Sequence, residues 1–489
     1  LPLTGIGVSF TSGADMIVAR LSSNGEELVG STYIGGSEND GTNTSASLKY
    51  NYADEVRGEI ELDDDGNVLI GSCTFSNDFP VTPDAYQSEN EGGQEAVIFS
   101  LDPLMSDLLH SSFFGSSGDD AFYSINYFDD GTIMAGGGSS SDDLPTTAGV
   151  VQENYGGGQA DGIIVHFNSE FSGTNQMTYY GSESYDQVYF IERDVEGNPH
   201  IYGQTEATGS QFIINADYGT ANSGMLLANF NPTVESVIWS TVFGTGNNVP
   251  NLSPTAFSVD ICNRIYLSGW GGIVNSQGST NGLDVTEDAL QSTTDGSDFY
   301  FMVLDGDASD ITFGSFYGGN LSSEHVDGGT SRFDRSGKIY QAVCAGCGSN
   351  DDFPIFPSNA HSPTNNSSNC NLGVAKIDFD LPLVIADFES DEVCLPLPTT
   401  FQNLSEITSE QSTDYQWFFG DGGESSEENP QYEFSSPGTY EVTLIVSDPE
   451  ACNLADTIIQ EITVFPPFSL DVPNQVVSCM DDTLSITAE

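Results

Sequence analysis

The residues best suited to chemistry in this sequence are its cysteines, two of which stand three positions apart. Cys344-Ala-Gly-Cys347 has the spacing of a redox pair, and Cys370 follows it. A redox pair normally opens a helix, whose terminus lowers the thiol pKa, whereas this pair ends a strand-like run. Zinc would need a fourth ligand, for which only His325 or His361 is near. We therefore predict a structural disulfide among Cys344, Cys347 and Cys370.

Two acidic clusters have the composition of calcium-binding loops. They are Asp63-Asp-Asp-Gly-Asn67 and Asp305-Gly-Asp-Ala-Ser-Asp310. Neither has the glutamate at the twelfth position or the flanking helices of an EF-hand. Both fall where hairpins are expected, and Asp and Gly are frequent in hairpins for conformational reasons. Two interpretations stay open: plain turns, or weak calcium sites at Asp63, Asp65, Asp305, Asp307 and Asp310. No other cofactor is expected.

Acid–base chemistry has one distinctive candidate, His325 with Asp327 beside Gly328-Gly329. The same residues can instead fix a turn by hydrogen bonding, which is the interpretation we favour. The chain has no Gly-x-Ser-x-Gly elbow, phosphate-binding loop or His-Glu-x-x-His motif. Paired carboxylates are too common in so acidic a chain to identify a glycosidase. We predict a non-enzymatic protein, and a secreted polysaccharide hydrolase is the alternative.

The charge is strongly negative, with 73 acidic and 9 basic residues and a net charge of −64. Such a surface repels nucleic-acid phosphates and anionic lipid headgroups, so neither is expected as a partner. No apolar run approaches the roughly 20 residues of a membrane-spanning helix. The chain starts at Leu1 without a signal peptide and stops at Glu489 within a strand-like pattern. We expect it to be part of a longer protein.

A strand of alternating apolar residues recurs six times in the first 380 residues. Its copies start near residues 15, 95, 161, 223 and 298, with a last copy at 371–379. After each of the first five comes a strand ending in an aromatic residue and glycine, such as Thr178-Tyr-Tyr-Gly181. A further apolar run and a turn–strand unit such as Asp65-Gly-Asn-Val-Leu-Ile-Gly71 follow. About four strands per repeat is the size of one β-propeller blade.

The fold prediction is therefore all-β: a β-propeller over residues 1–380 with at least six blades, partly encoded upstream. Leu1-Pro-Leu-Thr4 matches Phe79-Pro-Val-Thr82, so a blade is expected to precede residue 1. The strand at 371–379 is expected to close the ring by pairing with strands from the N-terminal side. Segments with proline, such as Asp78-Phe-Pro80, are expected to link one sheet to the next, because proline cannot donate to a β-ladder.

The fifth repeat carries a family resemblance in residues 324–334, 339–348 and 365–373. With the other repeats it resembles the SBBP-type repeats of bacterial surface proteins, and more closely the large gliding-motility-associated proteins of Bacteroidota, which the type IX system exports. The resemblance implies a modular protein outside the cell or on its surface. It would serve adhesion, matrix or secretion-related assembly, with a protein or glycan ligand or secretion-system components as partners.

The pattern changes near residue 384. Asp414-Tyr-Gln-Trp-Phe-Phe-Gly-Asp-Gly422 and Ser436-Pro-Gly-Thr-Tyr-Glu-Val-Thr-Leu-Ile-Val-Ser-Asp448 resemble a PKD domain, an Ig-like β-sandwich, over 384–465. Alternating Tyr440, Val442, Leu444 and Val446 would form its core with Trp417. In that module Cys394 and Cys452 are expected to form a disulfide. Residues 467–489 are expected to begin a further Ig-like domain.

The resemblance to Bacteroidota surface proteins also implies O-glycosylation at Asp-Ser/Thr followed by a small or aliphatic residue. Two positions fit this pattern, Thr457 in Asp456-Thr-Ile458 and Thr483 in Asp482-Thr-Leu484. The motif is short, so chance matches are common in a chain rich in Asp, Ser and Thr. A glycan at Thr457 would border a strand edge and would hinder edge-to-edge pairing between molecules.

Overall fold

A computed structural model describes residues 13–467 except 53, 129, 273–274, 276–277, 327–330, 335, 392 and 408–412. The chain divides into two compact units, residues 1–379 and 380–489, hereafter the repeat unit and the C-terminal unit. The protein is all-β. Within the described residues its one helical segment is the 3₁₀ turn η1 (Asp54–Val56). No helix there is long and apolar enough to cross a membrane.

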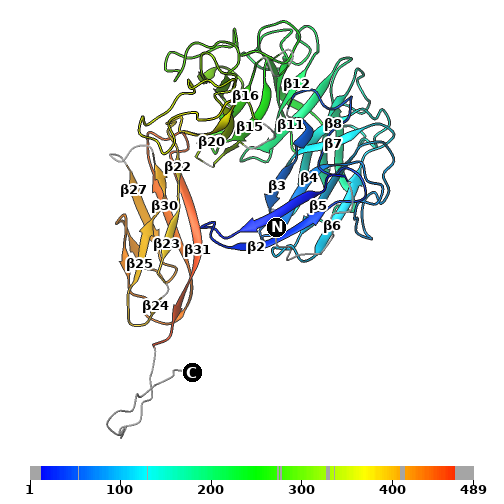
Figure 1. Ribbon diagram of the computed structural model, residues 1–489. Helices are drawn as coiled ribbons and strands as arrows, with labels where there is room; N and C mark the ends of the chain where they lie inside the picture. The colour runs from blue at the N-terminus through cyan, green and yellow to red at the C-terminus, as the bar shows by residue number, and fades with distance from the viewer. Residues whose placement is uncertain are drawn as a thin grey trace, which may run out of the picture. The chain divides into compact units, whose positions relative to one another are not determined.

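The repeat unit contains four antiparallel sheets of four strands, which follow one another along an arc (Figure 1). The first sheet holds β3 (Glu59–Leu62), β4 (Val68–Thr74), β5 (Glu95–Leu101) and β6 (Leu108–Phe114). The second holds β7 (Asp120–Tyr127), β8 (Ile133–Ser139), β9 (Asp161–Phe167) and β10 (Thr174–Tyr180). The third holds β11 (Asp186–Arg193), β12 (Pro199–Thr205), β13 (Met225–Phe230) and β14 (Val237–Phe243). The fourth holds β15 (Ser253–Val259), β16 (Ile265–Trp270), β17 (Phe299–Leu304) and β18 (Ile311–Tyr317).

Two smaller sheets flank these four along the chain. The earlier one pairs β1 (Met16–Leu21) with β2 (Leu28–Ile34), and the later one orders β19 (Arg332–Phe333), β20 (Ile339–Ala345) and β21 (Asn371–Ile377). Each complete sheet takes its first two strands from the end of one sequence repeat and its last two from the start of the next. The repeat was therefore detected with the right length but with a phase shifted by two strands.

This shift makes two expectations wrong. Among the described residues, which begin at 13, the strand at 371–379 does not pair with a strand from the N-terminal side, because β21 is the third strand of its sheet and pairs with β20 from Ile339↔Ile377 to Ala345↔Asn371. The segment containing Asp78-Phe-Pro80 does not link two sheets. It joins β4 to β5 within one sheet, where an irregular connector leaves the missing proline N–H without consequence.

The hairpins between the first and second strands follow the predicted turn chemistry. Gly66 and Gly131 have φ values of +76° and +84°, which glycine adopts without steric cost. The side chain of Asp63 accepts hydrogen bonds from the amides of Asp65 and Asn67, at 3.0 and 2.8 Å. Asp194 accepts the equivalent pair in the third sheet, at 3.0 and 2.8 Å. An aspartate that organises its own turn recurs from sheet to sheet.

Successive sheets pack face to face through fully buried apolar residues. Ile98 on β5 and Phe122 on β7 belong to one buried cluster between the first and second sheets. A Cβ added at Gly71 on β4 would lie 2.6 Å from Ile125 Cγ2 on β7. The second strands therefore carry glycine where the next sheet approaches most closely.

The C-terminal unit is built from short strands around two long ones. Its five-stranded sheet is ordered β24 (Val393–Cys394), β31 (Ala455–Phe465), β30 (Gly438–Ser447), β27 (Asp414–Phe418) and β28 (Glu424–Ser425). A second sheet is ordered β23 (Phe388–Ser390), β25 (Thr399–Asn403) and β29 (Gln431–Tyr432), and β22 (Val384–Ile385) pairs with β26 (Glu406–Ile407). Trp417, Val442, Leu444 and Val446 are fully buried, as the alternation predicts, and Trp417 Nε1 donates to the Glu427 carbonyl at 2.9 Å.

The predicted Cys394–Cys452 disulfide does not form. Cys394 is an exposed free thiol, whereas Cys452 is disulfide-bonded. The reason is geometric: Cys394 pairs with Phe465 at the end of β31, and Cys452 precedes the start of the same eleven-residue strand. At roughly 3.3 Å per residue the strand separates the two positions by about 30 Å, far beyond disulfide reach. Residues 468–489, predicted to begin another Ig-like domain, lie outside the described residues.

Candidate binding pocket at the inner strands

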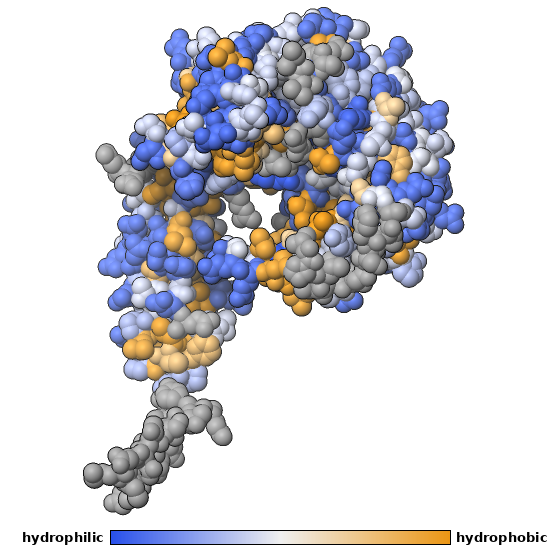
Figure 2. Space-filling view, viewed as in Figure 1, coloured by the Kyte–Doolittle hydropathy of each residue, from blue (hydrophilic) through white to orange (hydrophobic). Residues whose placement is uncertain are grey.

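A hollow of the repeat unit, about 740 Å³, lies among strands that begin different sheets. Apolar and charged side chains share its walls. It is lined by residues of β1, β3, β11, β15 and β19, with neighbours: Val18–Leu21, Ser23, Glu59–Leu62, Val68, Phe190, Glu192, Ala256–Ser258 and Ser331–Phe333. In the view of Figure 2, hydrophilic residues cover most of the repeat unit, and apolar residues reach the surface along the inner side of the arc. Because five strands from distant parts of the chain contribute, the pocket depends on the arrangement of the whole unit.

The pocket concentrates glutamates and arginines. Arg332 Nη2 donates to Glu59 Oε1 at 2.5 Å, although 273 residues separate them. Glu61 and Glu192 line the same pocket. Asn126 Nδ2 donates to Glu192 Oε2 at 3.1 Å, which fixes that carboxylate against β7. Arg20 is the second guanidinium in the wall, so two of the nine basic residues of the chain lie here.

Burial raises the pKa of each of the three glutamates in the pocket. It raises the pKa of Glu59 to about 7, against the opposing effect of the Arg332 guanidinium. Burial, followed by the like charges of Glu61 and Glu59, raises the pKa of Glu192 well above its ordinary value. Burial also raises the pKa of Glu61. With a pKa near 7, Glu59 can present either a hydroxyl donor or a carboxylate acceptor beside the guanidinium donors of Arg20 and Arg332.

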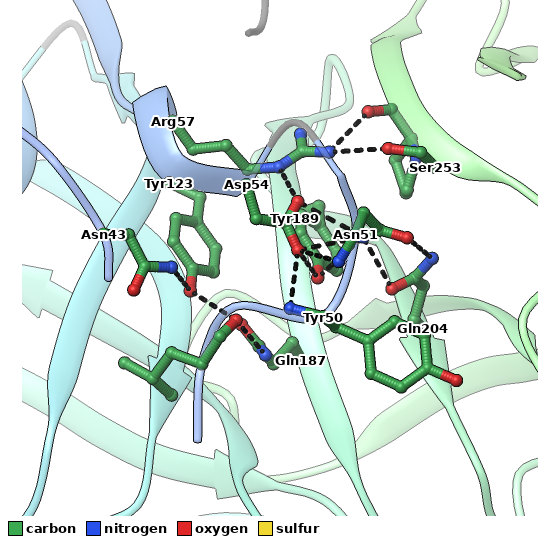
Figure 3. Close-up of polar contacts among 12 residues, drawn as sticks. Asn43, Tyr50, Asn51, Asp54, Arg57, Tyr123, Gln187, Tyr189, Gln204 and Ser253 are labelled. Carbon is green, nitrogen blue, oxygen red and sulfur yellow. Dashed lines mark hydrogen bonds and ion pairs between the residues drawn. The ribbon is translucent and has the colours of Figure 1, made fainter. Parts of the chain in front are cut away.

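A separate, buried polar network joins the first strands of neighbouring sheets to one another (Figure 3). It is formed by the segment 43–57 between β2 and β3. Arg57 Nε donates to Asp54 Oδ1 at 2.5 Å, and Arg57 Nη2 donates to Ser253 Oγ at 3.1 Å on β15. The guanidinium lies 4.4 Å from the centre of the Tyr189 ring on β11. Burial opposes the charge of Arg57, but the Asp54 carboxylate outweighs it and raises the pKa of the guanidinium.

The same segment reaches two further strands. Asn51 Nδ2 donates to Gln204 Oε1 on β12 at 3.0 Å, and Asn43 Nδ2 donates to the Tyr123 hydroxyl on β7 at 3.1 Å (Figure 3). Ser253 begins β15, and Tyr123 and Tyr189 lie midway along β7 and β11, whereas Glu192 and Ser258 lie near the ends of β11 and β15. The network therefore joins the first halves of the inner strands, and the pocket is lined by residues from their second halves.

The residues predicted as weak calcium sites are engaged in hairpins. Asp63 orders the β3–β4 turn with the amides described above. In the β17–β18 turn, Asp305 Oδ1 accepts from Thr312 Oγ1 at 2.6 Å, Asp307 accepts from the Ser309 amide, and Asp310 accepts from the Ile311 amide. Among the residues that the structure describes, no group of three or more His, Cys, Asp or Glu side chains is arranged to hold a metal ion. The turn interpretation therefore accounts for their positions, and calcium at these loops stays a prediction.

The cysteine cluster forms a disulfide between Cys347 and Cys370, while Cys344 stays outside the bond. The main chain of Cys344 donates to the His325 carbonyl at 2.9 Å. This main-chain bridge places His325 beside β20, and the role of its side chain in fixing a turn stays a prediction. Its predicted companion Asp327 lies outside the described residues. Thr457 is exposed on β31, and Thr483 lies outside the described residues.

Sequence reasoning missed Glu59, Glu192 and Arg332. Each belongs to the first strand of a sheet, which the repeat comparison recognised only as a further apolar run, without marking its charged residues. The usable signal is a charged residue within an apolar run, as in Glu59-Ile-Glu-Leu62 and Phe190-Ile-Glu-Arg193. Such residues at inner-strand positions of a sheet array face one another rather than solvent.

The C-terminal unit has the two packed sheets and buried tryptophan of an Ig-like β-sandwich. Residues 384–464 match the PKD domain family, and this part of the chain is a PKD domain. It is similar to the PKD1 domain of Vibrio anguillarum Epp, with 29% identity over 17% of this chain and 96% of that one, at a TM-score of 0.15. It is also similar to the PKD1 domain of the Vibrio cholerae metalloprotease PrtV, with 30% identity over 17% and 98% and a TM-score of 0.14. No curated protein matches the chain.

Proposed function

We propose that this chain is an extracellular, non-enzymatic binding protein whose repeat unit is a β-propeller and whose pocket takes a neutral saccharide. The PKD domain would act as a spacer. The observation that carries the ligand class is the pocket composition: three glutamates and two arginines in a chain of net charge −64.

The propeller assignment is supported by the order of the sheets and by the Glu59–Arg332 ion pair. Four consecutive four-stranded meanders, each packed on the next, follow the plan of propeller blades. The ion pair joins the first strand of the earliest complete sheet to the first strand of the last sheet. The sheets of the described residues do not form a closed ring, because β1–β2 and β19–β21 do not pair with one another.

A neutral polyhydroxyl ligand fits this pocket better than a charged one. A cation would meet Arg20 and Arg332, and an anion would meet three glutamates. A sugar hydroxyl can donate to a carboxylate and accept from a guanidinium, so it matches both kinds of group at once. The apolar walls from Leu21, Leu62 and Phe333 suit the C–H faces of a sugar ring.

The extracellular assignment is supported by the PKD domain and by disulfide bonds in the chain. Roles in adhesion, matrix or gliding-related assembly rest on the sequence resemblance alone. The same is true of the SBBP repeats, of a Bacteroidota origin and of type IX export.

A glycan array with the purified chain tests the proposal. We expect selective retention of neutral oligosaccharides and at least tenfold weaker binding by Glu192→Gln. Glu196→Gln is the matched control, because Glu196 is exposed in the turn that follows the same strand and does not line the pocket. Retention of no glycan, or equal loss in both variants, would reject the pocket as a saccharide site.

One observation favours a second candidate, a polysaccharide hydrolase. Three glutamates with raised pKa values share one pocket, and general acids in glycosidases are carboxyl groups of raised pKa. Release of reducing ends from a polysaccharide, abolished by Glu59→Gln or Glu192→Gln, would replace the binding function with this one.

A further inference from the structure

Buried carboxylates recur in pairs at the junctions between neighbouring sheets. One member begins or immediately precedes the third strand of a sheet, and the other begins the next sheet or, for Glu324, lies in the segment that leads to it. The pairs are Glu95 with Asp120, Asp161 with Asp186, and Asp298 with Glu324. Five of the six residues have no exposed surface, and Glu324 is 1% exposed.

In the first and third of these pairs, both members converge on a glycine that follows the fourth strand. A Cβ built at Gly115 would lie 2.5 Å from Asp120 Oδ2 and 2.9 Å from Glu95 Oε2. At Gly318 the corresponding distances are 2.1 Å to Asp298 Oδ1 and 2.8 Å to Glu324 Oε2. Oxygens from two carboxylates therefore lie within 3 Å of one point, in space that only glycine leaves open.

Glu95 and Asp161 each have one carboxylate oxygen held by a hydrogen bond and one without a partner, and both oxygens of Asp298 are without a partner. Gln87 Nε2 donates to Glu95 Oε1 at 2.5 Å, and the Gly156 amide donates to Asp161 Oδ2 at 2.5 Å. Glu95 Oε2, Asp161 Oδ1 and both carboxylate oxygens of Asp298 are buried without a hydrogen-bond partner. An unpaired buried carboxylate oxygen is costly, so these atoms call for a proton or a cation.

No basic side chain among the described residues supplies the positive charge that would compensate these carboxylates. The ion pairs found among the described residues involve none of the six acids. Main-chain oxygens, by contrast, are close: a Cβ at Gly92 would lie 2.1 Å from the Gly118 carbonyl, 2.6 Å from the Ser116 carbonyl and 3.1 Å from Glu95 Oε2. Carboxylate and carbonyl oxygens together are the donor set of calcium.

The junction between the third and fourth complete sheets, which carries no acid pair, provides an internal comparison. Ser223 and Asn251 stand where the other junctions carry acids, next to Gly244. They are fully hydrogen-bonded by loop amides: Gly246 N donates to Ser223 Oγ at 3.1 Å, and Thr245 N donates to Asn251 Oδ1 at 3.1 Å. The fold can thus build this junction from neutral residues, so the acid pairs are not required by the backbone.

We propose that the Glu95/Asp120, Asp161/Asp186 and Asp298/Glu324 junctions are divalent-cation sites of calcium type that join neighbouring sheets. Each ion takes one oxygen from each acid, with main-chain carbonyls and water completing the shell. A calcium–oxygen distance of about 2.4 Å lets one ion bridge oxygens up to about 5 Å apart, which the convergence on Gly115 and Gly318 allows. These sites differ from the hairpin loops at Asp63 and Asp305 and do not depend on the saccharide proposal.

The test is calcium titration of the chelator-treated full chain by calorimetry at neutral pH, with thermal unfolding in parallel. We expect up to three bound ions and a lower unfolding midpoint in chelator. The double variant Asp161→Asn/Asp186→Asn makes that junction neutral, like the junction of Ser223 and Asn251, and should remove one ion. The matched control Asp63→Asn/Asp305→Asn changes hairpin acids and should leave the junction ions in place.

If the variants fail to fold, the proposal can still be tested by soaking terbium into crystals of the unaltered chain. Anomalous density beside Gly115 and Gly318 would support the sites. Absence of bound calcium, with an unfolding midpoint unaffected by chelator, would overturn the proposal in favour of a shared proton. Loss of binding only in the hairpin control would also overturn it.

Discussion

Glu59 on β3 and Arg332 on β19 form an ion pair at 2.5 Å across 273 residues of sequence. β3 begins the first complete sheet and β19 begins the last, so the pair joins strands that no β-ladder connects. It holds one wall of the pocket to the other. The shape of the pocket and the stability of the repeat unit are therefore coupled through these two side chains.

A double-mutant cycle of Glu59→Gln and Arg332→Met should measure this coupling. The Arg332 side chain is 47% exposed, so we expect about 0.5–1.5 kcal/mol, as for other partly solvated pairs. Denaturant unfolding of the four proteins gives the value. Lys338 and Asp378, 3.9 Å apart with a 55% exposed carboxylate, provide the control cycle and should couple by less than about 0.5 kcal/mol. Equal values in both cycles would show that the pocket pair has no special role.

Glu59→Gln should also change the pH dependence of stability. Burial raises the folded-state pKa of Glu59 to about 7 from 4.5, while Arg332 opposes the rise and Glu61 adds to it. Because the folded state binds this proton more tightly, its contribution is full below pH 4.5 and is lost as pH rises through 7. The variant stays neutral at this position. Its free energy of unfolding relative to that of the unaltered chain should therefore increase between pH 5 and 8, by at most about 3 kcal/mol.

Thermal unfolding at several pH values measures this difference. Glu196→Gln, in an exposed turn, should leave the pH profile unchanged. A profile for Glu59→Gln parallel to that of the unaltered chain would mean that Glu59 ionises normally in the fold.

Arg57→Met should destabilise the repeat unit by about 3 kcal/mol, because it leaves the Asp54 carboxylate buried without its counter-charge. Both side chains are at most 5% exposed. Asp54 keeps donors from Asn51 and Tyr189, which limits the loss. Lys49→Met is the matched control, because the Lys49–Glu55 pair is more than one-third exposed on each side and should contribute less than about 1 kcal/mol. Similar denaturation midpoints for the two variants would contradict the role assigned to the buried network.

The alternation of apolar and polar residues correctly predicted which side chains of a strand are buried. Val442, Leu444 and Val446 were placed in the PKD core correctly because strand side chains alternate between two faces. Self-comparison gave the length of the repeat but not its phase, since a repeating sequence has no intrinsic starting point. The strand at 371–377 was therefore assigned to ring closure, although it pairs with β20.

The pocket escaped prediction for a different reason. Glu59 and Arg332 are neighbours only after several sheets have packed, and no local spacing encodes that distance. The acidic segment at 305–310 forms a hairpin turn as expected, but composition does not show which residue adopts the left-handed conformation in it. Ala308 adopts φ +54° and is fully buried, as is Met105 (φ +60°) in the equivalent turn of the first sheet. The turn is set by packing of this side chain against the unit, which composition alone cannot reveal.

Free thiols of different exposure should respond differently to alkylation. Cys394 is exposed on β24, whereas Cys73 on β4 is 1% exposed and burial raises its pKa to about 12. The thiolate is the reactive form, so iodoacetamide at neutral pH should label Cys394 within minutes and leave Cys73 unlabelled while the chain is folded. Peptide mass mapping before and after denaturation measures both sites, and denaturation should make Cys73 reactive. If Cys394 resists alkylation in the native chain and becomes reactive only after reduction, it forms a disulfide, which would contradict the free thiol on β24.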